Sequence, residues 1–172
     1  MQQGNIFSDL PDDARCWVYV ADEPLAESTV EALRSRAQSF LGTWQSHGRT
    51  VIGAMEVLDK QIVLLAANVE GGDISGCGID KSVHMVEQAA RELGISWLPA
   101  LRIVYRDADG HVQHCSRSEF KARVEDATVT SNTHVFDPTV QSVGDVREGQ
   151  LEQPARQSWH STVFDLTDSV PA

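Results

Sequence analysis

The stretch VIGAMEVLDKQIVLLAANV, residues 51–69, determines the expected fold class. It contains two strand-like runs, 51–58 and 61–69, separated only by Asp59 and Lys60. A connection of this length predicts a tight β-hairpin, although it lacks the glycine typical of such turns. The second run is almost entirely apolar, which indicates a central, well-covered strand.

Strands and helices are expected on both sides of this hairpin, because β-rich runs and helical apolar spacing alternate along the chain. The resulting order β-α-β-β-α-β predicts an α+β protein with a ferredoxin-like sandwich, in which two helices cover one face of an antiparallel sheet. The expected elements are a strand at 16–20, a helix through 30–44 stopped by Gly48, the hairpin, a helix through 83–93 capped by Asp80, and a strand at 101–105.

Four regions are expected along the chain. Residues 1–14 are polar and predict a flexible leader, and residues 15–116 form the ferredoxin-like core. Residues 117–160 predict a small annex packed on the core, with a helix opened by the capping box Ser116–Glu119 and a strand at 133–136. A tail follows at 161–172.

The charge and cysteine content exclude several classes of protein. The net charge is −11, and such a field repels phosphate backbones, so nucleic-acid binding is not expected. No apolar stretch is long enough for a membrane span, and the N-terminus has no signal-peptide pattern. Three cysteines without paired spacing favour reduced thiols in the cytoplasm. The acidic, lysine-poor composition fits either salt adaptation or an ordinary acidic protein.

A glycine-rich loop at 71–82 (GGDISGCGIDKS) is the main candidate site, since it joins the apolar strand to a helix N-terminus. The loop is not a P-loop, because Asp80 stands where the last glycine of that motif is required. A carboxylate there opposes a triphosphate and blocks close backbone approach. Nucleotide hydrolysis is therefore not expected.

Cys77 is the candidate nucleophile of this loop. Its position before a helix favours the thiolate, and its glycine neighbours leave the sulfur accessible. A base would come from His84, from His160 or from Asp80. In the alternative interpretation, which carries more weight, Cys77 is a small buried residue, the glycines make a turn and Asp80 only caps the helix. The expected ligand-binding residues are Ser75, Gly76, Gly78, Asp80, Lys81, Ser82 and Trp159.

The pair Trp159-His160 is a second candidate. It either folds back over the glycine-rich loop and brings an imidazole to Cys77, or Trp159 anchors the C-terminus on the core and His160 is merely exposed, and the second alternative is favoured. The histidines show no metal-binding spacing, so no metal and no cofactor are expected.

Four segments together resemble a group of small bacterial proteins of unknown function, many of which carry the label "ABC transporter ATPase". The resemblance covers residues 16–160 and implies no established activity. The label does not fit this chain, which has no Walker A motif. The family often has serine after the cysteine, where this chain has Gly78. The segments are SGCGIDKSVH at 75–84, SRSEF at 116–120, VFD at 135–137 and SWH at 158–160.

Two functions follow as expectations. The first is a non-enzymatic cytoplasmic module that binds a protein or small-molecule partner. The sheet face without helices must be covered by the annex or by a second copy, which predicts a possible homodimer. The alternative is a thiol-dependent enzyme or anion binder that uses Cys77.

Overall fold

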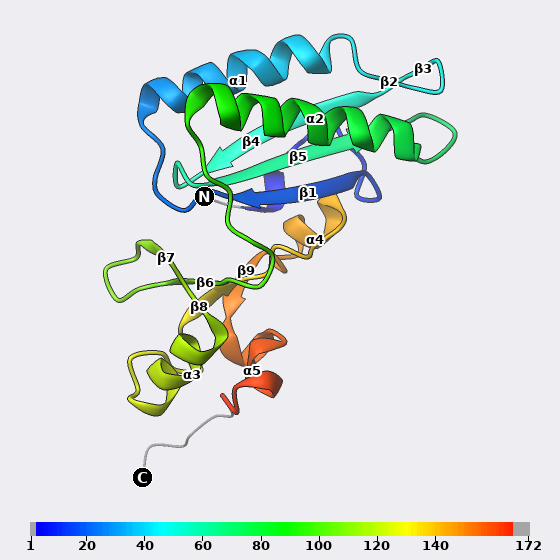
Figure 1. Ribbon diagram of the computed structural model, residues 1–172. Helices are drawn as coiled ribbons and strands as arrows, with labels where there is room; N and C mark the ends of the chain where they lie inside the picture. The colour runs from blue at the N-terminus through cyan, green and yellow to red at the C-terminus, as the bar shows by residue number, and fades with distance from the viewer. Residues whose placement is uncertain (1–2, 167–172) are drawn as a thin grey trace. The chain divides into compact units, whose positions relative to one another are not determined.

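The structure is a computed structural model that describes residues 3–166, and it shows an α+β protein (Figure 1). The contacts divide the chain into two compact units. Unit 1 comprises the residues up to Leu98 together with Thr139–Glu148, and unit 2 comprises Pro99–Pro138 and the residues from Gly149 onward. The expected boundary at residue 116 is therefore wrong, because residues 99–116 belong with the C-terminal part of the chain.

A three-stranded antiparallel sheet forms the centre of unit 1. Its strands β1 (Arg15–Val20), β4 (Ile52–Leu58) and β5 (Ile62–Asn68) lie in the order β1-β5-β4. The predicted hairpin is confirmed. Asp59 and Lys60 both adopt positive φ, at 51° and 55°, as a two-residue turn of primed type requires. The expected central strand is also confirmed, since β5 is buried from its first residue to Ala67.

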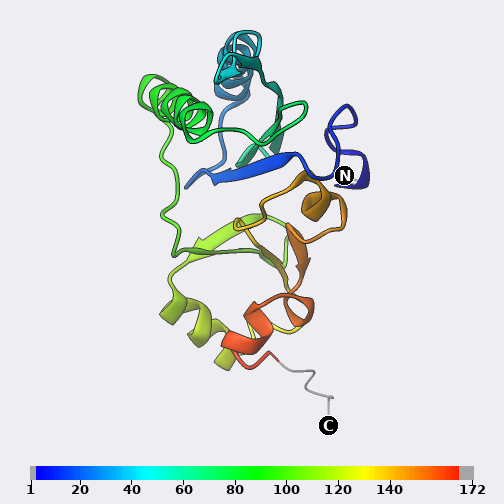
Figure 2. The same ribbon diagram turned by 90° about the vertical axis from the view of Figure 1, so that its right-hand side faces the viewer.

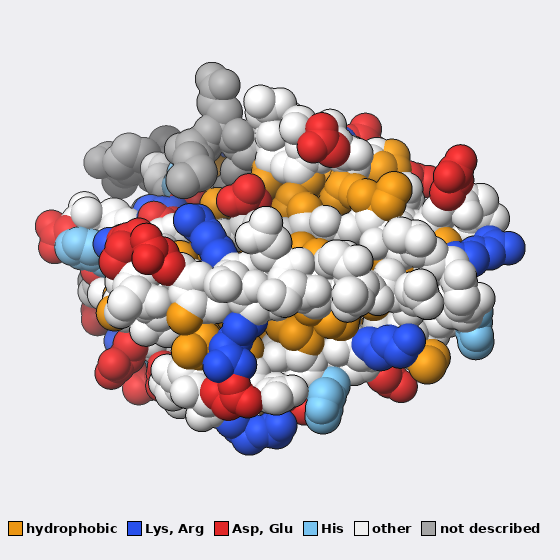
Figure 3. All heavy atoms as spheres, turned by 90° about the horizontal axis from the view of Figure 1, so that it is seen from above, with side chains coloured by type: hydrophobic (Ala, Val, Ile, Leu, Met, Phe, Trp, Pro, Cys, Tyr) orange, Lys and Arg blue, Asp and Glu red, His pale blue; other side chains and the backbone are white. Residues whose placement is uncertain are grey.

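Two helices, α1 (Glu27–Leu41) and α2 (Gly76–Leu93), cover one face of this sheet (Figure 1). Their apolar side chains, including Leu33 and Ala89, pack on Val63 of the central strand. Viewed from above in Figure 3, their outer side shows apolar atoms only in strips among polar and charged side chains. The helices therefore direct most of their apolar surface toward the sheet.

The first helix ends earlier than the sequence spacing suggested. It is capped by Gly42, and Trp44 lies beyond it as a buried residue. The chain then makes a short hairpin of β2 (Gln45–Ser46) and β3 (Arg49–Thr50), with positive φ at His47 and Gly48. Gly48 therefore serves this hairpin and does not stop the helix.

The fourth strand of the expected ferredoxin-like sandwich is not part of the unit 1 sheet. The edge of β1 that faces away from β5 forms one hydrogen bond at each end instead of pairing with a strand. The N–H of Leu98 donates to the carbonyl oxygen of Val20 at 2.7 Å, and the N–H of Cys16 donates to the carbonyl oxygen of Gln141 at 2.9 Å. Pro99, which has no N–H, follows Leu98 directly and ends that pairing. Residues 103–106 pair within unit 2 instead.

The expected flexible leader is an ordered part of unit 1 from residue 3, beginning with the short helix η1 (Gln3–Asn5). Phe7 and Leu10 are buried, and the guanidinium of Arg147 donates to their carbonyl oxygens at 2.7 and 2.8 Å. Arg147 ends α4 (Val143–Arg147), which lies on the face of the sheet opposite to α1 and α2 (Figures 1 and 2).

The face of the central strand opposite to the helices is buried. Its residues Ile62, Leu64 and Ala66 have no exposed surface. Coverage of this face by the annex or by a second copy, and with it the expected homodimer, stays a prediction.

Unit 2 contains a four-stranded antiparallel sheet in the order β7-β6-β8-β9. Its core includes Phe120, Val135, Ala155 and Phe164. Ordered structure continues through residue 166, so the tail expected from residue 161 begins later, and residues 167–172 lie outside the described part. The elements are β6 (Ile103–Arg106), β7 (Val112–Cys115), α3 (Arg117–Glu125), β8 (His134–Phe136), β9 (Glu152–Pro154), η2 (Ala155–Gln157) and α5 (His160–Val163).

Candidate functional site

The glycine-rich loop leads into helix α2 earlier than expected. Ser75 is the N-cap, its hydroxyl accepts the N–H of Gly78 at 3.1 Å, and the helix begins at Gly76. Asp80 is therefore an exposed residue of the second turn and not the cap. Cys77 lies inside the first turn, so the expected position before the helix is wrong.

The β2–β3 hairpin fixes this first turn. The hydroxyl of Ser46 is 2.6 Å from that of Ser75 and accepts the Ser75 N–H at 2.8 Å. The indole of Trp44 donates to the carbonyl oxygen of Gly78 at 2.9 Å. A Cβ atom on Gly78 would lie 3.0 Å from the Cβ of Ser46 and 2.9 Å from Cγ1 of Ile74. Glycine is thus required here because the hairpin approaches the helix so closely.

Several predicted ligand-binding residues serve this packing. Ser82 is buried, and its hydroxyl donates to the carbonyl oxygen of Ile79 at 2.7 Å. Lys81 is exposed and donates to the carbonyl oxygen of Gln45 at 3.3 Å. Ser75, Gly78 and Lys81 thus connect the helix to residues 44–46, whereas the bond of Ser82 lies within the helix.

Cys77 is exposed, so the alternative in which it fills the core is wrong. Among the described residues, none of the proposed bases forms a hydrogen bond with it, although Asp80 is exposed only three residues further along the same helix. His84 is also exposed on α2, but it lies seven residues further on, a rise of roughly 10 Å along the helix axis. This separation is too long for a nucleophile–base hydrogen bond.

His160 is enclosed in unit 2, where it is 1% exposed. Its Nδ1 is 2.9 Å from the Ser158 hydroxyl, and its ring stacks on Trp159 with centroids 3.8 Å apart. Burial lowers the pKa of His160 to about 4, and the negative charge of Asp137, which raises the pKa, offsets only part of this effect. The imidazole is therefore neutral near pH 7 and packed among aromatic rings, so the expectation that His160 is merely exposed is wrong.

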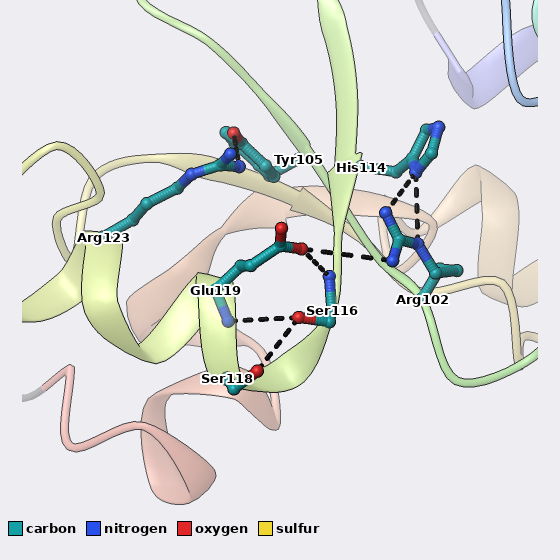
Figure 4. A network of polar contacts seen from close by, with 7 residues as sticks. All are labelled: Arg102, Tyr105, His114, Ser116, Ser118, Glu119 and Arg123. Carbon is teal, nitrogen blue, oxygen red and sulfur yellow. Dashed lines mark hydrogen bonds and ion pairs between the residues drawn. The ribbon is translucent and has the colours of Figure 1, made fainter.

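A network of polar side chains holds the start of α3 (Figure 4). The predicted capping box is confirmed: the Ser116 hydroxyl accepts the N–H of Glu119 at 3.2 Å, and the Glu119 carboxylate accepts the N–H of Ser116 at 2.7 Å. Arg102 lies 4.0 Å from that carboxylate and donates to Nδ1 of His114 at 3.2 Å. A guanidinium only donates, so this Nδ1 carries no proton. The carboxylate of Glu119 is thus directed toward Ser116 and Arg102.

On unit 2, residues of α3 and of the end of α5 line a groove of about 360 Å³, which we name the α3–α5 groove. Val163 is 46% exposed, whereas Phe164 is 9% exposed. The guanidinium carbon of Arg117 lies 5.9 Å from the Phe164 ring centroid. This groove was not predictable from the sequence, because its two sides are more than 40 residues apart in the chain. It is lined by Arg117, Ser118, Lys121, Val163, Phe164 and Asp165.

The side chains of Asp107, Asp109 and His111 place potential metal-ligating atoms within 4.8 Å of one another. They lie in the turn between β6 and β7. Asp107 already accepts the N–H groups of Asp109 and His111 at 3.0 and 2.9 Å, and the side chain of Gln113 at 2.9 Å. These bonds account for the cluster as part of the turn.

Comparisons with family models, with curated proteins and with solved structures gave no match to this chain. Among the helices of residues 3–166, none has both the length and the apolar character needed to cross a membrane.

Proposed function

We propose that this chain is a non-enzymatic binding module of the cytoplasm and that the α3–α5 groove is its binding surface. The observation that carries the proposal is the exposure of Val163 beside the groove, with two cationic side chains on the opposite side. Exposed apolar surface bordered by charge is typical of interaction sites. The three free thiols support a reducing compartment.

The groove has a firm base. Phe164 packs on Phe120 with ring centroids 4.8 Å apart, and Phe120 is fully buried in the core of unit 2. The capping box of Ser116 and Glu119 fixes the first turn of α3. A surface held in this way loses little conformational entropy when a partner binds.

A thiol-dependent reaction at Cys77 is the second candidate, and the exposure of that side chain is its support. A reaction of this kind needs a base within hydrogen-bond reach. His84 is two turns away on α2, and the ring of His160 is enclosed in the core of unit 2. Asp80 is near in sequence but forms no hydrogen bond with Cys77 among the described residues. Binding is therefore the function that we favour.

Site-specific photo-crosslinking in living cells tests the proposal. A photoreactive phenylalanine replaces Ser118, which lines the groove, and a control chain carries it in place of the exposed Ser28 on α1. We expect discrete adducts from position 118 that position 28 does not give. Equal adduct patterns at the two positions, or none at position 118, would refute a binding surface at the groove.

A further inference from the structure

We infer that the α3–α5 groove binds an acidic peptide segment of a partner protein, in which a large apolar side chain lies between carboxylates. This inference rests on the proposed function and names the chemistry of the partner.

The cationic side of the groove is the first reason. Arg117 and Lys121 are four residues apart on α3, so their side chains project from the same side of the helix. Neither forms an ion pair within residues 3–166, and the one acidic residue that lines the groove is Asp165. Glu119, between them in sequence, directs its carboxylate to Ser116 and Arg102.

The apolar side is the second reason. Val163 is 46% exposed, and Trp159, one helical turn before it, is 39% exposed. The N–H of Val163 donates to the carbonyl oxygen of Trp159 at 3.3 Å, which places Val163 one turn after Trp159, the N-cap of α5. A simple anion would leave the exposed side chains of Val163 and Trp159 in contact with water. A leucine or phenylalanine side chain of a peptide would cover them, and this burial is favourable.

The charge of the whole chain separates the peptide from larger anions. A net charge of −11 repels nucleic acids and anionic membranes, which present long arrays of negative charge. A short segment with a few carboxylates experiences less of this repulsion and can pair locally with the two cations. The guanidinium of Arg117 also offers a fork of donors that matches a carboxylate.

Fluorescence anisotropy with a labelled, capped peptide of glutamates around a central phenylalanine tests the inference on the full chain. We expect saturable binding to the wild type and about tenfold weaker binding to the double variant Arg117→Glu, Lys121→Glu. The matched control, Arg34→Glu with Arg49→Glu, makes the same change of net charge at exposed positions of unit 1 and should bind as the wild type does. Lys121→Gln is a milder change that serves as the test if the double variant fails to fold. It should weaken binding by several-fold.

Three outcomes would overturn the inference. One is the absence of saturable binding of the peptide to the wild type. Another is equal weakening in the groove variant and the control. The third is equal or tighter binding of a peptide with serine in place of phenylalanine, of an oligonucleotide, or of vesicles of anionic phospholipid. If crosslinked adducts still form from position 118 after such a result, the groove remains a binding surface as proposed, and only the acidic peptide as its ligand is refuted.

Discussion

Acidification should destabilise unit 2 through His160, the buried imidazole between Trp159 and the core. In the unfolded chain this histidine takes up a proton below pH 6.5, its ordinary pKa, whereas in the folded chain burial holds the pKa at about 4. Between these values the unfolded state binds more protons. The free energy of unfolding therefore falls as the pH falls from 6.5 to 4.

The size of the effect follows from the two pKa values. Their difference corresponds to a total loss of about 3 kcal/mol once the pH is below 4, since each pKa unit is worth about 1.4 kcal/mol. About 2 kcal/mol of that should already be lost at pH 5. The Nε2 atom of His160 is buried without a hydrogen-bond partner among the described residues, so no acceptor there offsets the cost of protonation.

Urea unfolding at pH 7 and pH 5 measures this loss. Trp159 is the one tryptophan of unit 2, so its fluorine signal in protein labelled with fluorotryptophan reports that unit specifically. The variant His160→Gln keeps a polar side chain without a titrating group. It should be less stable than wild type at pH 7 but should lose about 2 kcal/mol less between pH 7 and pH 5. Parallel losses in the two proteins would refute the assignment of the effect to His160.

Three further predictions concern other contacts. Gly78→Ala should lower the free energy of unfolding by about 1–3 kcal/mol, because the new Cβ meets the β2–β3 hairpin. Gly76→Ala has open space around the new Cβ and should not lower it. Urea midpoints compare the two variants, and equal effects would contradict the packing argument. Glu152→Gln should destabilise unit 2 by about 2 kcal/mol, since it breaks the paired bonds of 2.7 and 2.8 Å from Arg106, and unchanged unfolding would contradict this role. Brief treatment of the native protein with iodoacetamide should label Cys77 alone by mass spectrometry, because the other two thiols are buried; a rate at Cys77 far above that of a free thiol would favour the thiol-dependent alternative.

Local signals in the sequence predicted the elements whose causes are local. The hairpin at Asp59-Lys60 follows from strand patterns on both sides of a two-residue gap, and the start of α3 follows from the capping box at Ser116. Helix boundaries were less accurate. The N-cap of α2 is Ser75, where Asp80 was expected, and both residue types are favourable at that position.

Pairing between distant segments was not predictable in the same way. The strand at 103–106 has the composition of a fourth ferredoxin-like strand, but its hydrogen-bonding partners are β7 and β8. Nothing near it in sequence indicates that Leu98 and Gln141 occupy the edge of β1 instead. The α3–α5 groove was missed for the same reason, since Arg117 and Val163 meet only after unit 2 has folded.

The exposure of Cys77 and the burial of His160 also reversed the expectations from residue type. A free cysteine is usually buried, and a histidine in a polar segment is usually exposed. Here the close approach of Ser46 to Gly78 buries the residue after the cysteine, and Trp159 covers the imidazole. Side-chain environment at these positions is set by tertiary packing.

The return of residues 139–148 to unit 1 has a consequence for biosynthesis. The ribosome must add about 40 further residues after Leu98 before the segment that covers β1 exists, which takes roughly 2–8 s at ordinary rates of translation. During that interval the nascent chain lacks the Arg147 contacts that hold its first residues. Chaperones that recognise apolar strands would therefore find their target on this protein while it is still being made.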